Sequence, residues 1–397
     1  MKAVTRALPG PPDLLSEAGE AGWLFRSEDR GLAARGVALR VELADGLAGA
    51  EGAVAAALAG FDTDDPIGRP GTGPVAIGAL PFDPAEPASL VVPRVVVGFD
   101  TDGAWETVVG DEAPPPAAGP EGAPPDAFRL VPTMPHAEWK ELVAGAVEEI
   151  AEGRFDKVVL ARRVDVEANR PFVVCDVLER LVSLYPACTV FSAEGFIGAS
   201  PELLVRRRGR LVESHPLAGT VARSGDEHGD EVLVAALMAS PKARLEHRLV
   251  VEAIGSALAS VCEEVHVPDR PSVLGLRNVS HLASHIEGRL AAGAPSALGL
   301  AALLHPTPAV CGSPQGPAFE YLRKVEGFER GRYAGPVGWV DTRGDGAWML
   351  GIRSALVSGR RASIYAGNGI VAGSDPAEEL AETQLKLQAL LAALVRP

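Results

Sequence analysis

Apolar residues recur at helical spacing between residues 139 and 150, which predicts an amphipathic helix ending near Gly153. The next segment, residues 157–166, is rich in β-branched residues and is apolar on both faces in its first half. That pattern is typical of a strand covered on both sides. A helix followed by a buried strand therefore marks the start of the most regular part of the chain.

Beyond this point the pattern predicts helices and strands in blocks rather than in strict alternation, which favours an α+β fold with largely antiparallel sheets. Strands are predicted at 189–193, 202–206, 337–340, 348–357 and 363–366, and helices at 241–264, 295–304 and 376–394. Residues 1–126 are predicted to form an N-terminal part of strands and loops that closes with a proline-rich loop at 113–125. Residues 136–393 carry all the candidate chemistry.

The helix predicted at 376–394 has a well-marked start. Asp375 is a good N-cap and Pro376 suits the first helical position. At about 100° per residue, Glu379, Glu382 and Lys386 share one face beside an apolar stripe. Gly367 and Gly369 precede this helix and are interpreted as a glycine turn that lets the backbone approach a ligand. A solvated charged face is the alternative.

The chain is acidic, with 52 Asp and Glu against 37 Lys and Arg, a formal charge of -15 and a pI near 5.1. Nucleic acid and anionic membrane surfaces are therefore disfavoured as partners, and an anionic ligand would need locally supplied cations. No apolar run is long enough for a transmembrane helix and no secretory h-region is present, so we expect a cytoplasmic protein that acts as a monomer. Four scattered cysteines indicate neither a zinc site nor a disulfide framework.

Glu246 is predicted to point toward the core, because Val250, Ile254 and Val261 share its side of the helix. A buried carboxylate is normally paired or metal-bound. A salt bridge, for example to a buried arginine, is one reading. With Glu379 and Glu382 available, a hard cation such as Mg²⁺ is the other.

Three further residues are candidates for chemistry. Arg353 is assigned by alternation to the face of Met349, Gly351, Ala355 and Val357, where its partner is a protein or a ligand carboxylate. Lys157 opens a buried strand and is either a base or an edge-protecting lysine. Glu202 follows a turn into an apolar strand, where burial would raise its pKa and keep it protonated as an acid.

His281 and His305 are too far apart in sequence to imply a shared metal, so both are expected to make structural hydrogen bonds. The glycines from Gly367 to Gly373 miss the dinucleotide-binding spacing, which excludes NAD binding as a reading.

Several segments together resemble the chorismate-utilising enzymes, in order and in spacing, over residues 136–393. They are Phe155-Asp-Lys-Val-Val-Leu-Ala-Arg, Gly198-Ala-Ser-Pro-Glu-Leu-Leu, His215-Pro-Leu-Ala-Gly-Thr, Lys242-x-Arg-x-Glu-His, His305-Pro-Thr-Pro-Ala-Val, Tyr333-Ala-Gly-x-Val-Gly-Trp and Ala366-Gly-x-Gly-Ile-Val with Glu382-Thr-x-x-Lys386. The resemblance implies a large α+β fold with two largely antiparallel sheets flanked by helices.

The resemblance also implies roles for the candidate residues. Lys157 matches the base that activates water and Glu202 the acid that protonates the departing C4 hydroxyl of chorismate. Glu246 and Glu382 resemble Mg²⁺ ligands, with Glu379 near the metal through water. The implied substrate contacts are Gly219, Thr220, His281, Ala309, Tyr333, Arg353, Gly367, Gly369 and Lys386.

This reading implies an isomerase, an isochorismate synthase in which water adds at C2 of chorismate as the C4 hydroxyl leaves. Salicylate synthases, which go on to eliminate pyruvate, are the alternative. They typically have threonine where this chain has Ala309, so stopping at isochorismate is favoured. A catalytically silent homologue is disfavoured, because every acid, base and ligand position holds a competent residue. The motifs do not distinguish a siderophore role from a menaquinone role.

Overall fold

The computed structural model describes residues 1–119 and 123–395. Residues 120–122 of the predicted proline-rich loop lie outside the described part. The rest of that loop contains no helix or strand, apart from an isolated bridge between Gly19 and Ala117. No helix within the described ranges is both long and apolar enough to cross a membrane.

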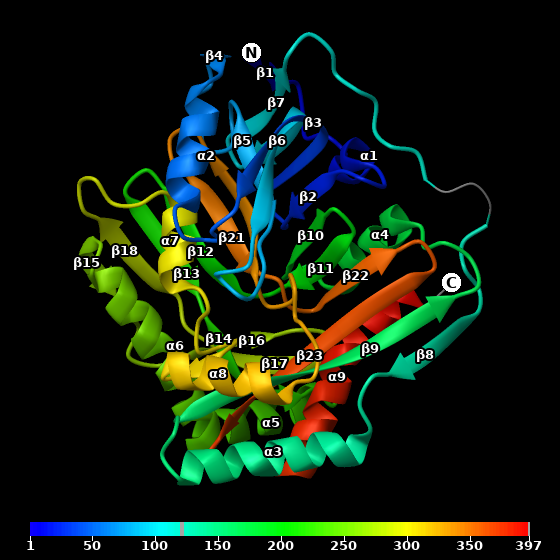
Figure 1. The fold of residues 1–397 in the computed structure, drawn as a ribbon, viewed down its shortest axis with the longest axis vertical. Helices are drawn as coiled ribbons and strands as arrows, with labels where there is room; N and C mark the ends of the chain where they lie inside the picture. Colours follow the sequence, from blue (N-terminus) through cyan, green and yellow to red (C-terminus); the bar gives the residue numbers. More distant parts are fainter. Residues whose placement is uncertain (120–122, 396–397) are drawn as a thin grey trace.

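The N-terminal part is built mainly of long antiparallel strands, at the top of Figure 1. Its elements are β1 (Lys2–Leu8), α1 (Leu14–Ala18), β2 (Trp23–Arg26), β3 (Gly31–Leu43), α2 (Ala50–Ala59), β4 (Asp62–Asp64), β5 (Val75–Ala79), β6 (Ala88–Asp100) and β7 (Gly103–Val109). The two helices were not predicted. Both are short, and neither carries a long apolar stripe that would separate it from the strand pattern.

The remainder of the chain mixes helices with shorter strands. Its first half contains β8 (Phe128–Pro132), α3 (His136–Ala151), β9 (Lys157–Ala168), α4 (Val174–Leu184), β10 (Thr189–Ala193), β11 (Phe196–Ser200), β12 (Leu203–Arg208), β13 (Leu211–His215), β14 (Leu217–Ala222), α5 (Glu227–Ala239) and α6 (Pro241–Ala259). Its second half contains β15 (Cys262–His266), β16 (Ser272–Gly275), β17 (Val279–Ala283), β18 (Ile286–Leu290), α7 (Ala297–Leu304), β19 (Gly312–Ser313), α8 (Gln315–Val325), β20 (Pro336–Asp341), β21 (Gly346–Leu350), β22 (Ser354–Ser358), β23 (Arg361–Val371) and α9 (Pro376–Leu394).

The strands form one large hydrogen-bonded sheet and a small sheet in the order β14-β17-β16. Among the described strand pairs, all but β1–β4 are antiparallel, which confirms the predicted α+β class. The large sheet runs through both parts of the chain, because β5 pairs with β20 and β2 with β10. The division of the chain near residue 126 stays a prediction.

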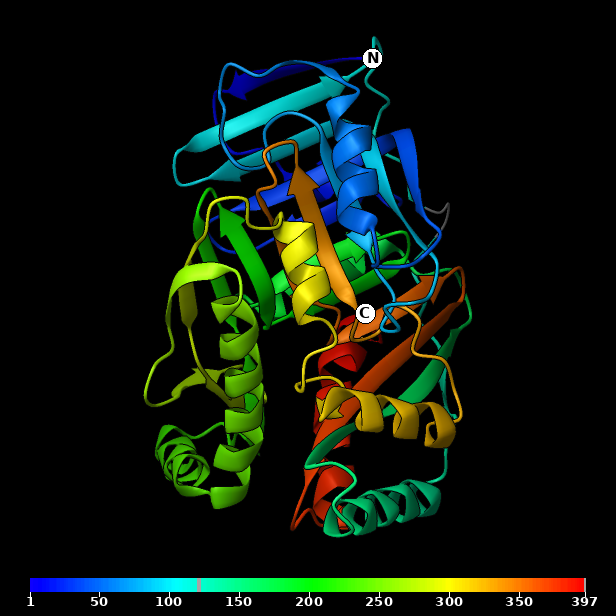
Figure 2. The same cartoon turned by 60° about the vertical axis from the view of Figure 1, so that its left-hand side comes forward.

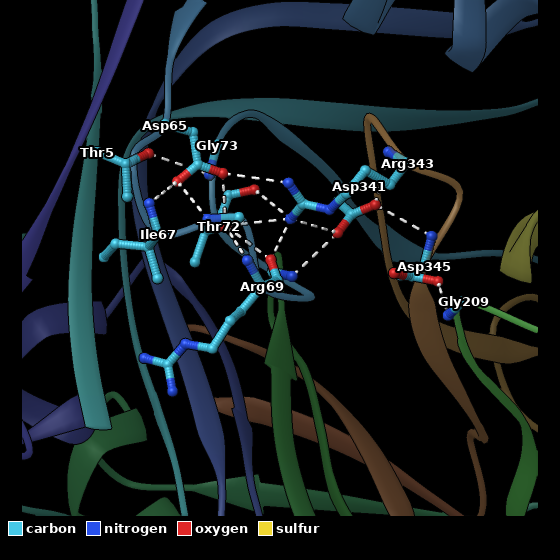
Figure 3. Close-up of polar contacts among 12 residues, drawn as sticks. Thr5, Asp65, Ile67, Arg69, Thr72, Gly73, Gly209, Asp341, Arg343 and Asp345 are labelled. Atoms are coloured by element: carbon cyan, nitrogen blue, oxygen red, sulfur yellow. Dashed lines mark hydrogen bonds and ion pairs between the residues drawn. The ribbon is translucent and has the colours of Figure 1, made fainter. Parts of the chain in front are cut away.

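A cluster of hydrogen bonds and ion pairs connects the N-terminal part to the β20–β21 hairpin, as Figure 3 shows. Asp65 lies 3.1 Å from the Arg343 guanidinium, and Asp341 accepts hydrogen bonds from the Gly71 amide and from Arg343. Asp341 is buried, and burial raises its pKa to about 6. These contacts tie the loop between β4 and β5 to the sheet that continues into β12.

Two long strands, β9 and β23, lie side by side in Figures 1 and 2 and pair in continuous register from Lys157↔Val371 to Glu167↔Arg361. Helix α9 packs on β23 and against α3. The start of α9 agrees with the sequence, since the Asp375 carboxylate accepts hydrogen bonds from the Ala377 and Glu378 amides. The helix predicted at 139–150 and the strand predicted at 157–166 are confirmed as α3 and β9.

Three predicted elements need correction. The strand predicted at 348–357 is two strands, β21 and β22, separated by a turn in which Arg353 has a left-handed φ of 51°. The helix predicted at 241–264 ends at Ala259, because the following residues form β15 and pair with β18. Gly367 and Gly369 are not in a turn: they lie within β23, opposite Ala161 and Val159 of β9.

Candidate active site

Most of the predicted site residues line one cavity of about 50 Å³. It is bordered by Glu202, Gly219, Thr220, Glu246, His281, Ala309, Tyr333, Arg353, Gly367, Gly369 and Lys386. A neighbouring cavity of about 480 Å³ shares Gly219, Thr220, Glu246 and Gly369 and adds Glu379 and Glu382. Residues that are up to 229 positions apart, such as Lys157 and Lys386, are thus brought to one region by the fold.

Lys157 is completely buried and borders neither cavity itself, but it contacts Glu246, which borders both. Its Nζ is 3.2 Å from Glu246 Oε1, but it makes no hydrogen bond with good geometry among the described residues. The edge-protecting alternative is wrong, because Lys157 pairs with Val371 on one side and Ser313 on the other. A buried amine with one ionic contact is a group available for proton transfer.

Glu246 is the ionic partner of Lys157, so the predicted salt bridge exists, with a lysine in place of an arginine. The carboxylate is not enclosed in the core. Its side chain is 15% exposed, accepts a hydrogen bond from the Gly219 amide and borders both cavities. The fully enclosed polar residue on α6 is its neighbour His247, which bonds to Ser284 Oγ at 2.8 Å.

Glu202 lies directly before β12 and is 3% exposed. Burial raises its pKa to about 7, against the smaller opposing effects of a Leu217 backbone hydrogen bond and the charges of Lys157, Arg353 and Lys386. Its backbone is fixed by hydrogen bonds with Ser200 Oγ and the Leu350 amide. A carboxyl group that keeps its proton near neutral pH can serve as a general acid.

Arg353 does not lie on the strand face that alternation assigned to it. The turn between β21 and β22 directs its Nη2 to His281 Nε2, at 3.0 Å. Burial and the charge of Arg353 lower the pKa of His281 well below its usual value. Since a guanidinium can only donate, His281 Nε2 accepts and its proton resides on Nδ1, which lies near Gly219 O and Thr220 Oγ1.

His281 therefore has the structural hydrogen bonds predicted for it and also borders the cavity, where it orients Arg353. The left-handed φ of Arg353 is uncommon for a non-glycine residue, and such residues are often found at functional sites. His305 likewise makes a structural bond, from Nε2 to Phe82 O at 2.9 Å. Tyr333 is buried, and burial raises its pKa to about 12, so its hydroxyl remains a donor.

The glycines of β23 are required by long-range packing rather than by a turn. A Cβ on Gly367 would lie 2.9 Å from the Tyr333 hydroxyl. A Cβ on Gly369 would lie 2.8 Å from Lys157 Cε and would overlap a Glu246 carboxylate oxygen. These absent side chains leave the space in which Lys157 and Glu246 meet the cavity.

Each of the three candidate metal-binding glutamates has a lysine partner. Besides the Glu246–Lys157 pair, Glu379 Oε1 is 2.6 Å from Lys242 Nζ, and Glu382 Oε1 is 2.6 Å from Lys386 Nζ. Burial and the nearby charge of Glu382 raise the pKa of Glu379. Three lysine side chains are thus paired with three glutamate carboxylates around the two cavities.

These carboxylates fit a hard divalent cation by donor chemistry and by lining one cavity, since Mg²⁺ prefers carboxylate oxygens and water. In the described part of the chain, no three Asp, Glu, His or Cys side chains already converge on a metal-sized space. A cation would therefore replace lysine ammonium groups as the partner of at least some of these glutamates.

Sequence reasoning missed four polar residues at the site. Lys242 lies in one of the family motifs and donates to Glu379, a role that the motif alone did not indicate. Asn368 lies between the two glycines and connects Glu379 to Lys386, with its Nδ2 donating to Glu379 and its Oδ1 accepting from Lys386 Nζ. Glu326 and Arg330 form a buried ion pair, and Arg330 also borders the cavity. Their four-residue spacing is the only sequence signal that could have indicated them.

Comparison with known proteins places these residues in a family. A model described as "Chorismate binding enzyme" matches residues 118–395. The isochorismate synthase DhbC of Bacillus subtilis is 36% identical over 337 residues, covering 81% of each chain, and the isochorismate synthase EntC of Escherichia coli is 36% identical over 326 residues, covering 80% of each. The structure of MenF, the menaquinone-specific isochorismate synthase of E. coli, superposes with a TM-score of 0.80 at 27% identity, over 99% of this chain and 95% of the other.

Proposed function

The chain belongs to the chorismate binding enzyme family, and from that premise we propose that it is an isochorismate synthase, an isomerase that converts chorismate into isochorismate. Water adds at C2 of the ring while the C4 hydroxyl leaves, so one water is consumed and one is released. The observation that carries the proposal is a cavity bordered by a carboxyl group with a pKa of about 7 and adjoined by a buried lysine.

We assign the proton transfers to these two groups. Lys157, in its neutral amine form, removes a proton from the attacking water, and Glu202 delivers a proton to the departing hydroxyl. Arg353, held by His281, and Lys386, held by Gly367 O at 2.9 Å and by Glu382, supply positive charge for the substrate carboxylates. Tyr333 and the backbone at Gly219, Thr220, Gly367 and Gly369 complete the binding surface.

We further propose that Mg²⁺ is the cofactor, held by Glu246 and Glu382 with Glu379 through water. The bound ion would neutralise and orient the ring carboxylate of chorismate. A divalent cation and a dianion together add no net charge to the cavity. A cytoplasmic location and a monomeric state stay predictions from the sequence.

Incubating the purified protein with chorismate and MgCl₂ and separating the products by chromatography tests the function. We expect isochorismate as the main product. Recovery of unchanged chorismate from folded, magnesium-supplied protein would contradict the proposal.

Removal of divalent cations should lower turnover by about 10²-fold, because several kcal/mol of charge stabilisation would be lost. EDTA followed by excess MgCl₂ in a steady-state assay checks this result, with recovery expected on addition of the metal. Glu246→Gln should raise the magnesium concentration needed for half-maximal rate. Glu252→Gln, an exposed change on the same helix, serves as the control and should not. Full activity in metal-free buffer would contradict the cofactor assignment.

Ala309→Thr should make pyruvate release measurable, because threonine at this position matches the salicylate synthase pattern. Ala309 borders the cavity beside Val310 and Tyr333, so an added hydroxyl would reach the substrate space. A barrier lower by about 1.4 kcal/mol would raise the rate of pyruvate loss tenfold. Coupled detection of pyruvate measures it. Pyruvate and salicylate as major products of the unmodified protein would instead favour the salicylate synthase alternative.

A further inference from the structure

One edge of β9 is only partly covered by strands. Lys157 and Val158 pair with β19, and residues 164–168 pair with β8. Between them, the Ala161 amide donates to Glu326 Oε1 at 2.8 Å, and Val159 O accepts from Arg330 Nη2 at 2.6 Å. Two side chains of one ion pair therefore take the place of a neighbouring strand, two and four residues from Lys157.

The Arg330 guanidinium is almost fully committed. Of its five N–H groups, Nε donates to Glu326 Oε2 at 2.7 Å, one on Nη1 donates to Val310 O at 2.7 Å, and Nη2 donates to Val159 O and to Glu326 Oε1. Its side chain is 3% exposed, and that of Glu326 is 5% exposed. Arg330 borders the cavity, but its charge is matched and four of its five N–H groups are engaged, so it is not a free cation for substrate carboxylates.

The contacts of this pair join three segments that carry site residues. Val159 and Ala161 belong to the strand that begins with Lys157, and Val310 follows Ala309 directly. The backbone carbonyl of Arg330 accepts a hydrogen bond from the Tyr333 amide at 3.0 Å. The Arg330 guanidinium lies 4.2 Å from the ring centre of Phe82. Phe82 O in turn accepts from His305, at the start of the loop that holds Ala309.

We propose that the Glu326–Arg330 pair is a positioning device that fixes the cavity wall at Ala309 and Val310 relative to Lys157. By fixing this wall, the pair limits the loss of pyruvate from isochorismate. The proposal rests on the isochorismate synthase function. Pyruvate loss breaks the ring C–O bond while a hydrogen moves from the ring to the enolpyruvyl methylene carbon, giving salicylate and pyruvate. Both that step and water attack depend on placement, and a 1 Å displacement can cost about 10²-fold in rate.

Arg330→Lys tests the proposal, because a lysine keeps the charge but cannot reach Glu326, Val159 O and Val310 O together. We expect kcat to fall by about 10²-fold, with chorismate KM changed by less than about threefold because the groups assigned to substrate carboxylates remain. The ratio of pyruvate to isochorismate should rise by more than about threefold. Arg323→Lys, on the exposed side of α8 with a side chain 70% exposed, is the matched control and should leave all three quantities unchanged.

Glu326→Gln provides a second variant, because it removes the charge but retains an acceptor for the Ala161 amide. It should shift the product ratio in the same direction, with a loss in kcat of about tenfold. If folded variants melt at lower temperature but keep the unmodified kcat and product ratio, or if neither variant folds, the pair is a structural element and the proposal is wrong. If the unmodified protein makes no isochorismate, the proposed function fails instead.

Discussion

Lys157→Met should lower kcat by about 10²- to 10⁴-fold, the range for loss of a positioned acid or base. Lys157 is fully buried and pairs through its backbone with β19 and β23, and its one ion pair within the described residues is with Glu246. Methionine keeps the aliphatic stem that packs near Gly369 and removes the amine. Steady-state rates with chorismate and MgCl₂ measure the effect, and a thermal melt establishes that the variant is folded.

Lys140→Met on α3 is the control, since it removes a solvent-exposed lysine by the same substitution. The more disruptive Lys157→Ala should show a similar loss in kcat with a larger loss in melting temperature. A folded Lys157→Met enzyme with near-normal turnover would remove Lys157 from the mechanism and leave the source of the nucleophile's activation open to another group.

The candidate site could be predicted from sequence where local signals coincide with tertiary ones. The N-cap at Asp375 and the helical spacing of Glu379, Glu382 and Lys386 are local, and α9 begins and ends at the predicted residues. The buried strand that starts at Lys157 was recognised because its apolar residues occupy both faces. In each case residues within the segment itself specify the conformation, through the cap and charge spacing in the helix and the apolar pattern in the strand.

The misplaced residues are those whose conformation depends on distant partners. Alternation could not reveal the break at Arg353, because the chain leaves its pairing with β20 and joins β11 and β23 only in three dimensions. The predicted turn at Gly367 and Gly369 is wrong, because both lie in a strand where a Cβ would displace the side-chain ends of Tyr333, Glu246 and Lys157. Glycine in sequence indicates close approach but does not identify what approaches.

The need for cations near the site was predicted from the sequence, but the individual ion pairs were not. The sequence indicated that an acidic protein needs local cations to hold a dianion. It did not assign Lys242, Lys157 and Lys386 as the partners of Glu379, Glu246 and Glu382. Only the last of these pairs is four residues apart, the spacing at which charges on one helix meet. The other two join different elements, so no helical periodicity encodes them.

Glu202→Gln should also lower kcat by about 10²- to 10⁴-fold, and its effect should depend on pH in a defined way. Because the pKa of Glu202 is raised to about 7, the acid form predominates below pH 7 and is lost above it. The profile of kcat/KM in the unmodified enzyme should therefore fall as pH rises through about 7, and this limb should be absent from the small residual activity of Glu202→Gln. Initial rates from pH 5.5 to 9 measure both, with Glu141→Gln on the exposed face of α3 as the control.

At high pH, the Glu202→Gln substitution should change stability in the opposite direction to activity. A carboxyl whose pKa is higher in the folded than in the unfolded chain contributes stability at low pH, and that contribution is lost as pH rises through the folded value. Ionising buried Glu202 should thus cost about 3 kcal/mol above pH 7 relative to pH 4, a cost that glutamine does not incur. At pH 8, Glu202→Gln should melt at or above the temperature of the unmodified protein while turning over far more slowly. A variant that loses activity and stability together at pH 8 would show that Glu202 supports the fold rather than the proton transfer.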